Sequence, residues 1–155
     1  MSNNDYADIV EQVLAQIGKH VVLGLPLGLG KPNRLINAFY HRACQDSSIR
    51  LDIFTALSLN PPKAGSELEQ RFLQPFVKRH FGEDYPRLAY ADALAAQQLP
   101  ANITVTEFYF QSGSMLGNAD AQRHYVSSNY THVARDLADR GVNLILQLVA
   151  RRATE

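Results

Sequence analysis

The sequence has a single cysteine and no excess of charge of either sign. Cys44 alone excludes an internal disulfide framework and a metal site built from cysteines, and it indicates a reducing compartment. Lys plus Arg number 15 and Asp plus Glu number 15, so the formal net charge is zero. Nucleic-acid-binding domains usually have a basic excess, so we expect no nucleic-acid partner.

Long apolar runs are also missing. The longest apolar stretches, residues 21–29 and 142–150, contain Gly, Pro or polar residues and are shorter than the roughly 20 residues that cross a bilayer. The N-terminus has neither the basic stretch nor the apolar run of a signal peptide. We therefore expect a cytoplasmic protein with no membrane partner. Apolar residues make up 46% of the chain, which suffices for a folded core.

Apolar periodicity predicts strands that alternate with helices along the chain. The expected strands are 20–25, 50–57, 103–110 and 142–149, and the expected helices are 5–17, 32–43, 67–80, 85–99 and 131–140. This order predicts an α/β fold in one domain, 1–155: an open, mainly parallel sheet of about four strands with helices on both faces. The chain stops just after the fourth strand, so we expect a truncated domain.

The helix 67–80 has a clear start signal. Ser66 followed by Glu69 is a capping box, in which each side chain satisfies a free backbone N–H of the first turn. Apolar residues at a spacing of four are expected to face inward, and these are Leu68, Phe72 and Phe76.

A glycine-rich loop between the first strand and the next helix is the strongest candidate for binding. Such loops hold anions with backbone amides and the positive helix N-terminus. It is no Walker P-loop, because Lys31 precedes Pro32, and no dinucleotide fingerprint, because Asn33 replaces the third glycine. The alternative is a tight turn that needs glycine's freedom. The candidate residues are Gly24, Pro26, Gly28, Gly30, Lys31 and Asn33.

A second polar segment leads into the helix 131–140. Its candidate binding residues are Ser128, Asn129, Tyr130 and His132. Their polar groups precede a helix whose first turn has free N–H groups. The alternative is ordinary helix capping by Asn129 or Thr131.

Other chemistry-bearing residues give weaker signals. The five histidines form no HxxxH or HExxH pair, so we predict no metal site. Cys44 follows the inner stripe of its helix and is expected to be a packed thiol. Glu107 interrupts an apolar strand; it is expected to pair with a cation or face solvent, and a catalytic carboxylate with a raised pKa is the alternative.

Three sequence blocks together resemble the acetyl-CoA hydrolase/CoA-transferase family, and more narrowly its long bacterial members. The blocks are GLPLGLGKPNRL at 24–35, IFTALSL at 53–59 and YVSSNYTHVARDL at 125–137. The resemblance runs from about residue 20 to 150. It implies the front part of the first of two related α/β domains.

The resemblance also implies a chemistry. In the family, a glutamate carboxylate attacks an acyl-CoA thioester and forms acyl and then CoA adducts. That glutamate belongs to the second domain, so no catalytic residue is expected in this chain, and Glu107 does not inherit the role. The ten loop and segment residues named above would shape the pocket for CoA or acyl-CoA, which is a substrate rather than a bound cofactor. The second domain or a partner subunit would complete the enzyme.

Two other functions stay open. The chain can be a stand-alone module that binds CoA, a nucleotide or a sugar phosphate without catalysis, or one subunit of a split CoA transferase. A truncated domain would leave apolar surface uncovered, which predicts a homo-oligomer.

Overall fold

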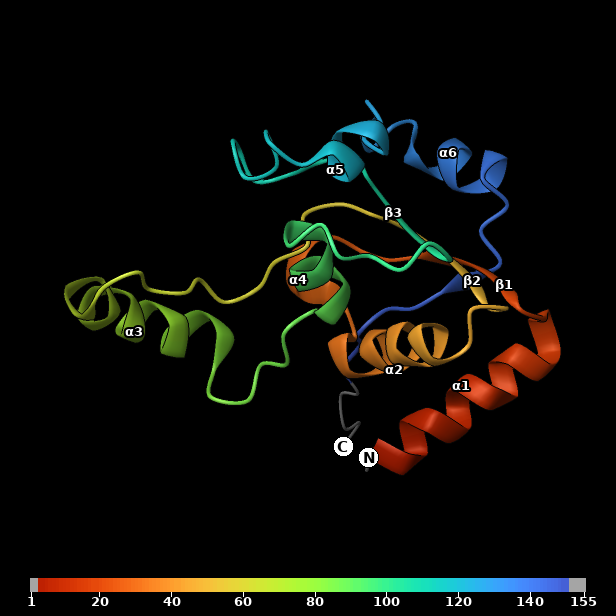
Figure 1. Cartoon of the computed structure of the whole chain (residues 1–155), viewed down its shortest axis with the longest axis horizontal. Helices are drawn as coiled ribbons and strands as arrows, with labels where there is room; N and C mark the ends of the chain where they lie inside the picture. Colours follow the sequence, from red (N-terminus) through yellow and green to blue (C-terminus); the bar gives the residue numbers. More distant parts are fainter. Residues whose placement is uncertain (1–2, 151–155) are drawn as a thin grey trace, which may run out of the picture.

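A computed structural model describes residues 3–150 (Figure 1). Its centre is an open four-stranded sheet in which every pairing is parallel, with the order β3-β2-β1-β4. The strands are β1 (His20–Gly24), β2 (Arg50–Thr55), β3 (Ile103–Glu107) and β4 (Leu144–Ile145). The α/β fold predicted from the alternation of strands and helices is confirmed.

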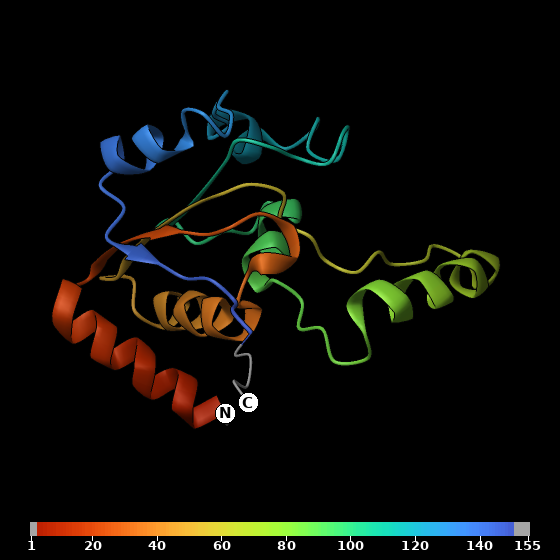
Figure 2. The ribbon, with the colours of Figure 1, turned by 180° about the vertical axis from the view of Figure 1, so that it is seen from behind.

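Helices cover both faces of the sheet. The helices are α1 (Asn3–Ile17), α2 (Asn33–Gln45), α3 (Glu67–Phe81), α4 (Ala89–Ala95), α5 (Ala119–Arg123) and α6 (Val133–Asp139), with a short 3-10 turn η1 (Gly28–Gly30). Helices α1 and α2 lie on one side of the sheet, and α5 and α6 lie on the other (Figures 1 and 2). Helix α4 packs beside α2.

The two faces of the sheet differ in polarity. The face toward α1, α2 and α4 holds the apolar core, which includes Leu23, Leu51, Ile53, Val105, Ile36 and Phe39. The face toward α6 mixes buried Val22 and Phe54 with polar residues of β2 and β3. Helix α6 comes so close to β1 that a Cβ on Gly24 would lie 3.2 Å from Leu137 and 3.1 Å from Val142. Glycine at this position therefore permits the close packing of α6.

The chain order places a switch point beside β1. From β1 the chain moves outward to β2 and β3, and β4 then returns to the other side of β1. Ligands of open α/β sheets bind at the carboxyl ends of the strands, near such points. The segment after β4 continues along the glycine loop, since the Leu148 amide donates to the Gly30 carbonyl at 2.9 Å.

Several elements are shorter than the periodicity predicts. The expected strand 142–149 contributes only the two residues of β4 to the ladder, and the expected strand 103–110 ends at Glu107. The expected helix 85–99 is reduced to α4, because Leu88 is extended before it and Gln97 has a φ of +56° after it. Pro86, two residues before Leu88, also disfavours a helical start at residue 85.

The inward orientation expected for the stripe on α3 is wrong. The Ser66 hydroxyl accepts the Glu69 amide at 3.2 Å, so the predicted cap is confirmed. However, α3 projects from the body of the molecule (Figures 1 and 2) and has no buried residue. Leu68 is 78% exposed, Phe72 83% and Phe76 48%. Periodicity predicted an amphipathic helix correctly, but it does not supply a neighbour for the apolar face.

No helix within residues 3–150 has the length and apolar character needed to traverse a bilayer.

The exposure of α3 predicts that its aromatic stripe contributes little to the stability of the chain. Phe72→Ser should change the free energy of unfolding by no more than about 0.5 kcal/mol. Ile36→Ala, at a fully buried core position, should cost about 2–5 kcal/mol. Urea denaturation followed by circular dichroism measures both, and a large loss in the Phe72 variant would mean that α3 packs on the body.

Candidate functional site

The carboxyl ends of β1, β2 and β3 are joined by the turn at residues 56–58. The Gly28 amide donates to the Leu57 carbonyl at 3.1 Å, and the Leu57 amide donates to the Tyr109 carbonyl at 2.8 Å. Leu57 has a φ of +47°, a left-handed conformation that is uncommon for a residue other than glycine. Conformations of this kind persist only where the surroundings enforce them, and they cluster at functional sites.

Lys31 lies under this turn and is 2% exposed. Its Nζ donates to the carbonyl oxygens of Ala56 at 2.8 Å and Leu57 at 3.3 Å. Burial lowers the pKa of Lys31 to about 8, and the charge of Glu107 opposes that shift. The ammonium group is thus held in the interior by backbone carbonyls and a nearby carboxylate.

Glu107, the last residue of β3, is the second ionisable group of the cluster and is 1% exposed. Its Oε2 accepts the Ser58 amide at 3.3 Å. Burial raises the pKa of the Glu107 carboxyl, while the hydrogen bonds from Ser58 and the charge of Lys31 lower it. The expectation of a solvent-facing carboxylate is wrong for this residue. The influence of Lys31 agrees with the expectation of a cationic neighbour.

Tyr90 completes the buried cluster from α4. Its phenol is fully buried, and its Oη lies 2.6 Å from the Ser58 Oγ. Burial is the main cause that raises the pKa of Tyr90, with a further contribution from the charge of Glu107. We name Lys31, Ser58, Tyr90 and Glu107 the buried polar cluster.

A cavity of about 340 Å³ opens onto this cluster. Glu107 and Ser58 line its base, and the segment 60–63, α4 and residues 110–115 form its walls. The walls are braced: Arg87 makes a bidentate pair with Asp92 at 2.9 and 2.7 Å and also donates to the Pro61 carbonyl. A buried carboxyl group at the base of a pocket, with its pKa shifted by burial and by a charged neighbour, is a candidate functional site.

The glycine-loop candidates run from the end of β1 through η1 to the start of α2, and the backbone N–H groups of the two central glycines donate within the protein. Gly28 N–H bonds to the Leu57 carbonyl and Gly30 N–H to the Leu27 carbonyl, at 3.1 and 3.2 Å. Gly24 packs under α6, and the carbonyl of Pro26 accepts the Thr55 hydroxyl at 3.3 Å. The loop therefore acts here as a braced turn whose two central amides donate within the protein.

Asn33, at the start of α2, is the one glycine-loop candidate with an unsatisfied group. Its side chain is 4% exposed, and its Nδ2 donates to the Pro86 carbonyl at 2.7 Å. Its Oδ1 is buried and has no hydrogen-bond partner. The amide thus anchors the segment before α4 to the start of α2.

The second group of candidates lies in the segment between α5 and α6. Asn129 Oδ1 accepts the Thr131 amide at 2.9 Å, which is the capping geometry that was the alternative to binding. Ser128 hydrogen-bonds to Asp136, while Tyr130 and His132 are exposed. No hydrogen bond or ion pair joins this segment to the glycine loop in the described part of the chain. The segment begins at the sheet edge, since the Val126 amide donates to the Glu107 carbonyl at 3.1 Å.

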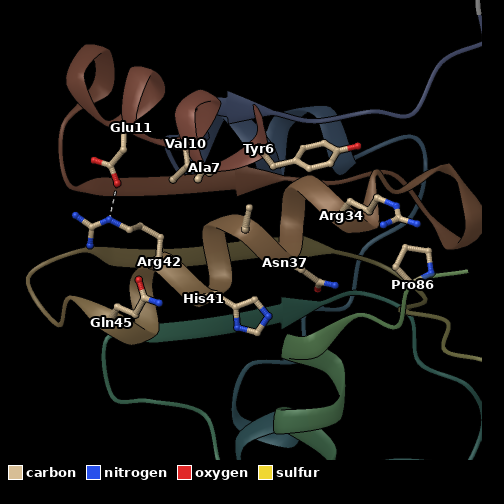
Figure 3. A pocket seen from close by; sticks show the side chains of 11 residues that line it. Tyr6, Ala7, Val10, Glu11, Arg34, Asn37, His41, Arg42, Gln45 and Pro86 are labelled. Carbon is tan, nitrogen blue, oxygen red and sulfur yellow. Dashed lines mark hydrogen bonds and ion pairs between the residues drawn. The ribbon is translucent and has the colours of Figure 1, made fainter. Parts of the chain in front are cut away.

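A separate hollow of about 410 Å³ lies between α1 and α2 (Figure 3). Arg42 Nε donates to Glu11 at 2.6 Å in this hollow, as the dashed line shows, and the exposed Arg34 also lines it. The Asn37 side chain bonds to the backbone of Arg87 and Ala89. This groove holds no buried ionisable group, so it is a weaker candidate than the cavity at Glu107.

Among residues 3–150, no group of three His, Cys, Asp or Glu residues could hold a metal ion. The expectation of a packed Cys44 thiol is wrong, because Cys44 is exposed on α2.

Sequence reasoning missed Ser58 and Tyr90 and assigned Lys31 to anion binding. The signal for Glu107 was present, since a carboxylate interrupts an apolar strand. No local pattern marks Ser58 or Tyr90, because each reaches the cluster only through the packing of distant segments.

Comparison of this chain with protein-family models, curated proteins and solved structures finds no match in any of the three.

The buried Lys31 predicts a pH dependence of stability. Its pKa is lower in the folded chain, about 8, than its usual 10.5, so between these values the unfolded chain binds the proton more tightly. Stability contributed by Lys31 should therefore rise with pH across this window, by up to about 3 kcal/mol. Lys31→Met should lack the rise.

Chemical denaturation at pH 7.5, 8.5 and 9.5 measures this as the difference in unfolding free energy between wild type and Lys31→Met. Lys78→Met, at an exposed lysine on α3, is the matched control and should run parallel to wild type. Parallel curves for Lys31→Met would contradict a buried, charged Lys31.

Proposed function

We propose that this chain is the N-terminal part of an acetyl-CoA hydrolase or CoA transferase of the cytoplasm. In this proposal it forms one side of the acyl-CoA site. The glutamate that attacks the thioester comes from a second domain or a partner subunit. Nucleophilic attack by a carboxylate divides a difficult acyl transfer into two easier steps.

The observation that carries the proposal is the spatial convergence of the three resembling blocks. The first block, 24–35, and the second, 53–59, are joined by the Gly28–Leu57 hydrogen bond and by both bonds of Lys31. The third block, 125–137, begins beside Glu107 and places Leu137 against Gly24. Segments far apart in sequence thus meet along the edge where open parallel sheets bind ligands.

The chain's own residues have two different tasks in this proposal. The glycine-loop residues, with buried Lys31 and Asn33, hold the shape of the sheet edge rather than contact phosphate directly. The exposed Tyr130 and His132, with Asn129, are free of the core and can contact the ligand or the second domain. Phosphate groups of CoA then require exposed cations, such as Lys63 at the rim of the cavity.

Uncovered apolar surface supports a further domain or subunit. A hollow of about 450 Å³ with a mainly apolar lining follows the end of β3, and Tyr109, Leu116 and Tyr125 are exposed around it. Exposed apolar patches of this kind mark interaction surfaces. The stripe on α3, formed by Leu68, Phe72 and Phe76, is another exposed apolar surface.

A stand-alone binding module is the second candidate. The cavity at Glu107 already has polar, charged and apolar side chains of this chain in its lining, so CoA, a nucleotide or a sugar phosphate could bind there without any chemistry.

The test uses the natural protein that contains this sequence, purified from its source cells and supplied with acetyl-CoA. We expect release of free CoA and loss of activity on treatment with borohydride only when acyl-CoA is present, because borohydride reduces the glutamyl thioester. Peptide mass spectrometry should locate the reduced residue on a glutamate outside residues 1–155.

Enzyme treated with borohydride in the absence of acyl-CoA is the control and should keep its activity. Binding of CoA without cleavage would favour the stand-alone module. A reduced residue at Glu107 would place the nucleophile in this chain. That result would overturn the proposal that the glutamate belongs to a second domain or a partner subunit.

A further inference from the structure

We propose that the cavity above Glu107 holds the pantetheine arm of the ligand, with an amide N–H donating to the Glu107 carboxylate and the phosphate end near Lys63. The identity of the ligand rests on the proposed function, whereas the site itself rests on the cavity and its buried carboxyl group.

The Glu107 carboxylate retains acceptor capacity toward the cavity. An ionised carboxylate offers about four lone-pair positions. The Ser58 amide, at 3.3 Å, the Ser58 hydroxyl and the Leu57 amide together occupy three of them, which leaves one for a ligand. Lys31 directs its hydrogen bonds to the carbonyls of Ala56 and Leu57. Because Glu107 is buried yet lines the cavity, a donor from a ligand can satisfy it where little water reaches.

The surrounding charges select a neutral donor at the base of the cavity. An ammonium group there would meet the nearby Lys31, and a phosphate or carboxylate would be repelled by Glu107. The rim has the opposite preference, since Lys63, which is exposed, and Arg87 outnumber its one carboxylate, Asp92, on which the charge of Lys63 also acts. Arg87, the other rim cation, is already paired with Asp92. The cavity therefore favours a molecule with an amide or hydroxyl donor at one end and an anion at the other.

The walls suit a chain with apolar segments. Leu94 of α4, Phe110 and Met115 are the large apolar residues that line the cavity. A pantetheine arm combines amide groups with a hydroxyl and apolar methyl and methylene groups, and its phosphate lies at one end. Its polarity pattern thus matches the cavity from base to rim.

The walls are also preorganised. Asn60 pairs with the backbone of Leu88 in both directions, at 2.7 and 3.2 Å, and the Tyr85 hydroxyl donates to the Leu59 carbonyl at 3.3 Å. These bonds fix the segment 58–63 against the segment before α4. Ligand binding then needs little ordering of the protein, which favours affinity.

The experiment is calorimetric titration of phosphopantetheine into the full chain at neutral pH. Glu107→Gln should weaken binding about tenfold or more, because a hydrogen bond to a charged acceptor becomes one to a neutral acceptor. Lys63→Met should weaken it several-fold, and that loss should shrink as salt is added.

A second pair of variants keeps the test valid if Glu107→Gln fails to fold. Ala95 is exposed and lines the cavity, whereas Ala96, its neighbour, is exposed outside it. Ala95→Trp should obstruct the cavity and abolish binding, while Ala96→Trp should bind like wild type. Neither change touches the buried polar cluster.

Equal affinity of wild type, Glu107→Gln and Ala95→Trp would overturn this site and leave the proposed function intact, because the arm would then bind elsewhere. Absence of phosphopantetheine binding by the wild-type chain would also overturn it. The borohydride experiment tests the proposed function independently, since it depends on thioester chemistry and not on this cavity.

Discussion

The burial of an ammonium group and a carboxyl group beneath one turn is the constraint on which the sheet edge depends. Neither charge reaches bulk water, so each must be satisfied by the protein. Lys31 requires carbonyl oxygens, and the turn at 56–58, in which Leu57 adopts a left-handed conformation, supplies them. The same turn presents the Ser58 amide to Glu107. One local geometry therefore couples the ends of three strands.

This coupling explains how a short α/β chain holds a defined cavity at the carboxyl edge of its sheet. The carboxyl ends of β1, β2 and β3 are fixed relative to one another by backbone and side-chain bonds rather than by apolar packing alone. The walls above them are tied by Asn60 and by the Arg87–Asp92 pair. By contrast, α3 projects without support. The candidate site is therefore held by hydrogen bonds within the chain, whereas α3 offers an exposed apolar surface suited to a partner.

Local sequence patterns predicted the main strands and helices. They failed where the outcome depends on which segments pack against each other. The apolar β-branched run at β1 and the cap at Ser66 are both visible in a few residues, because strand pairing and helix capping depend on short-range chemistry. The predicted inward orientation of Phe72 was wrong, because periodicity defines an apolar helix face but not the element that packs against it. The helix expected at 85–99 was too long, because composition favoured helix there while Leu88 and Gln97 adopt other conformations.

The sequence by itself determined the alternation of strands and helices, and hence the parallel sheet whose carboxyl edge carries the candidate site. It also marked Glu107 as an unusual carboxylate in an apolar strand. Only the tertiary structure decided the buried polar cluster. Ser58 contacts Glu107, which lies 49 residues away in the sequence, and Tyr90, which lies 32 residues away. Those contacts follow from the register of β2 and β3 and from the packing of α4, which no local pattern contains.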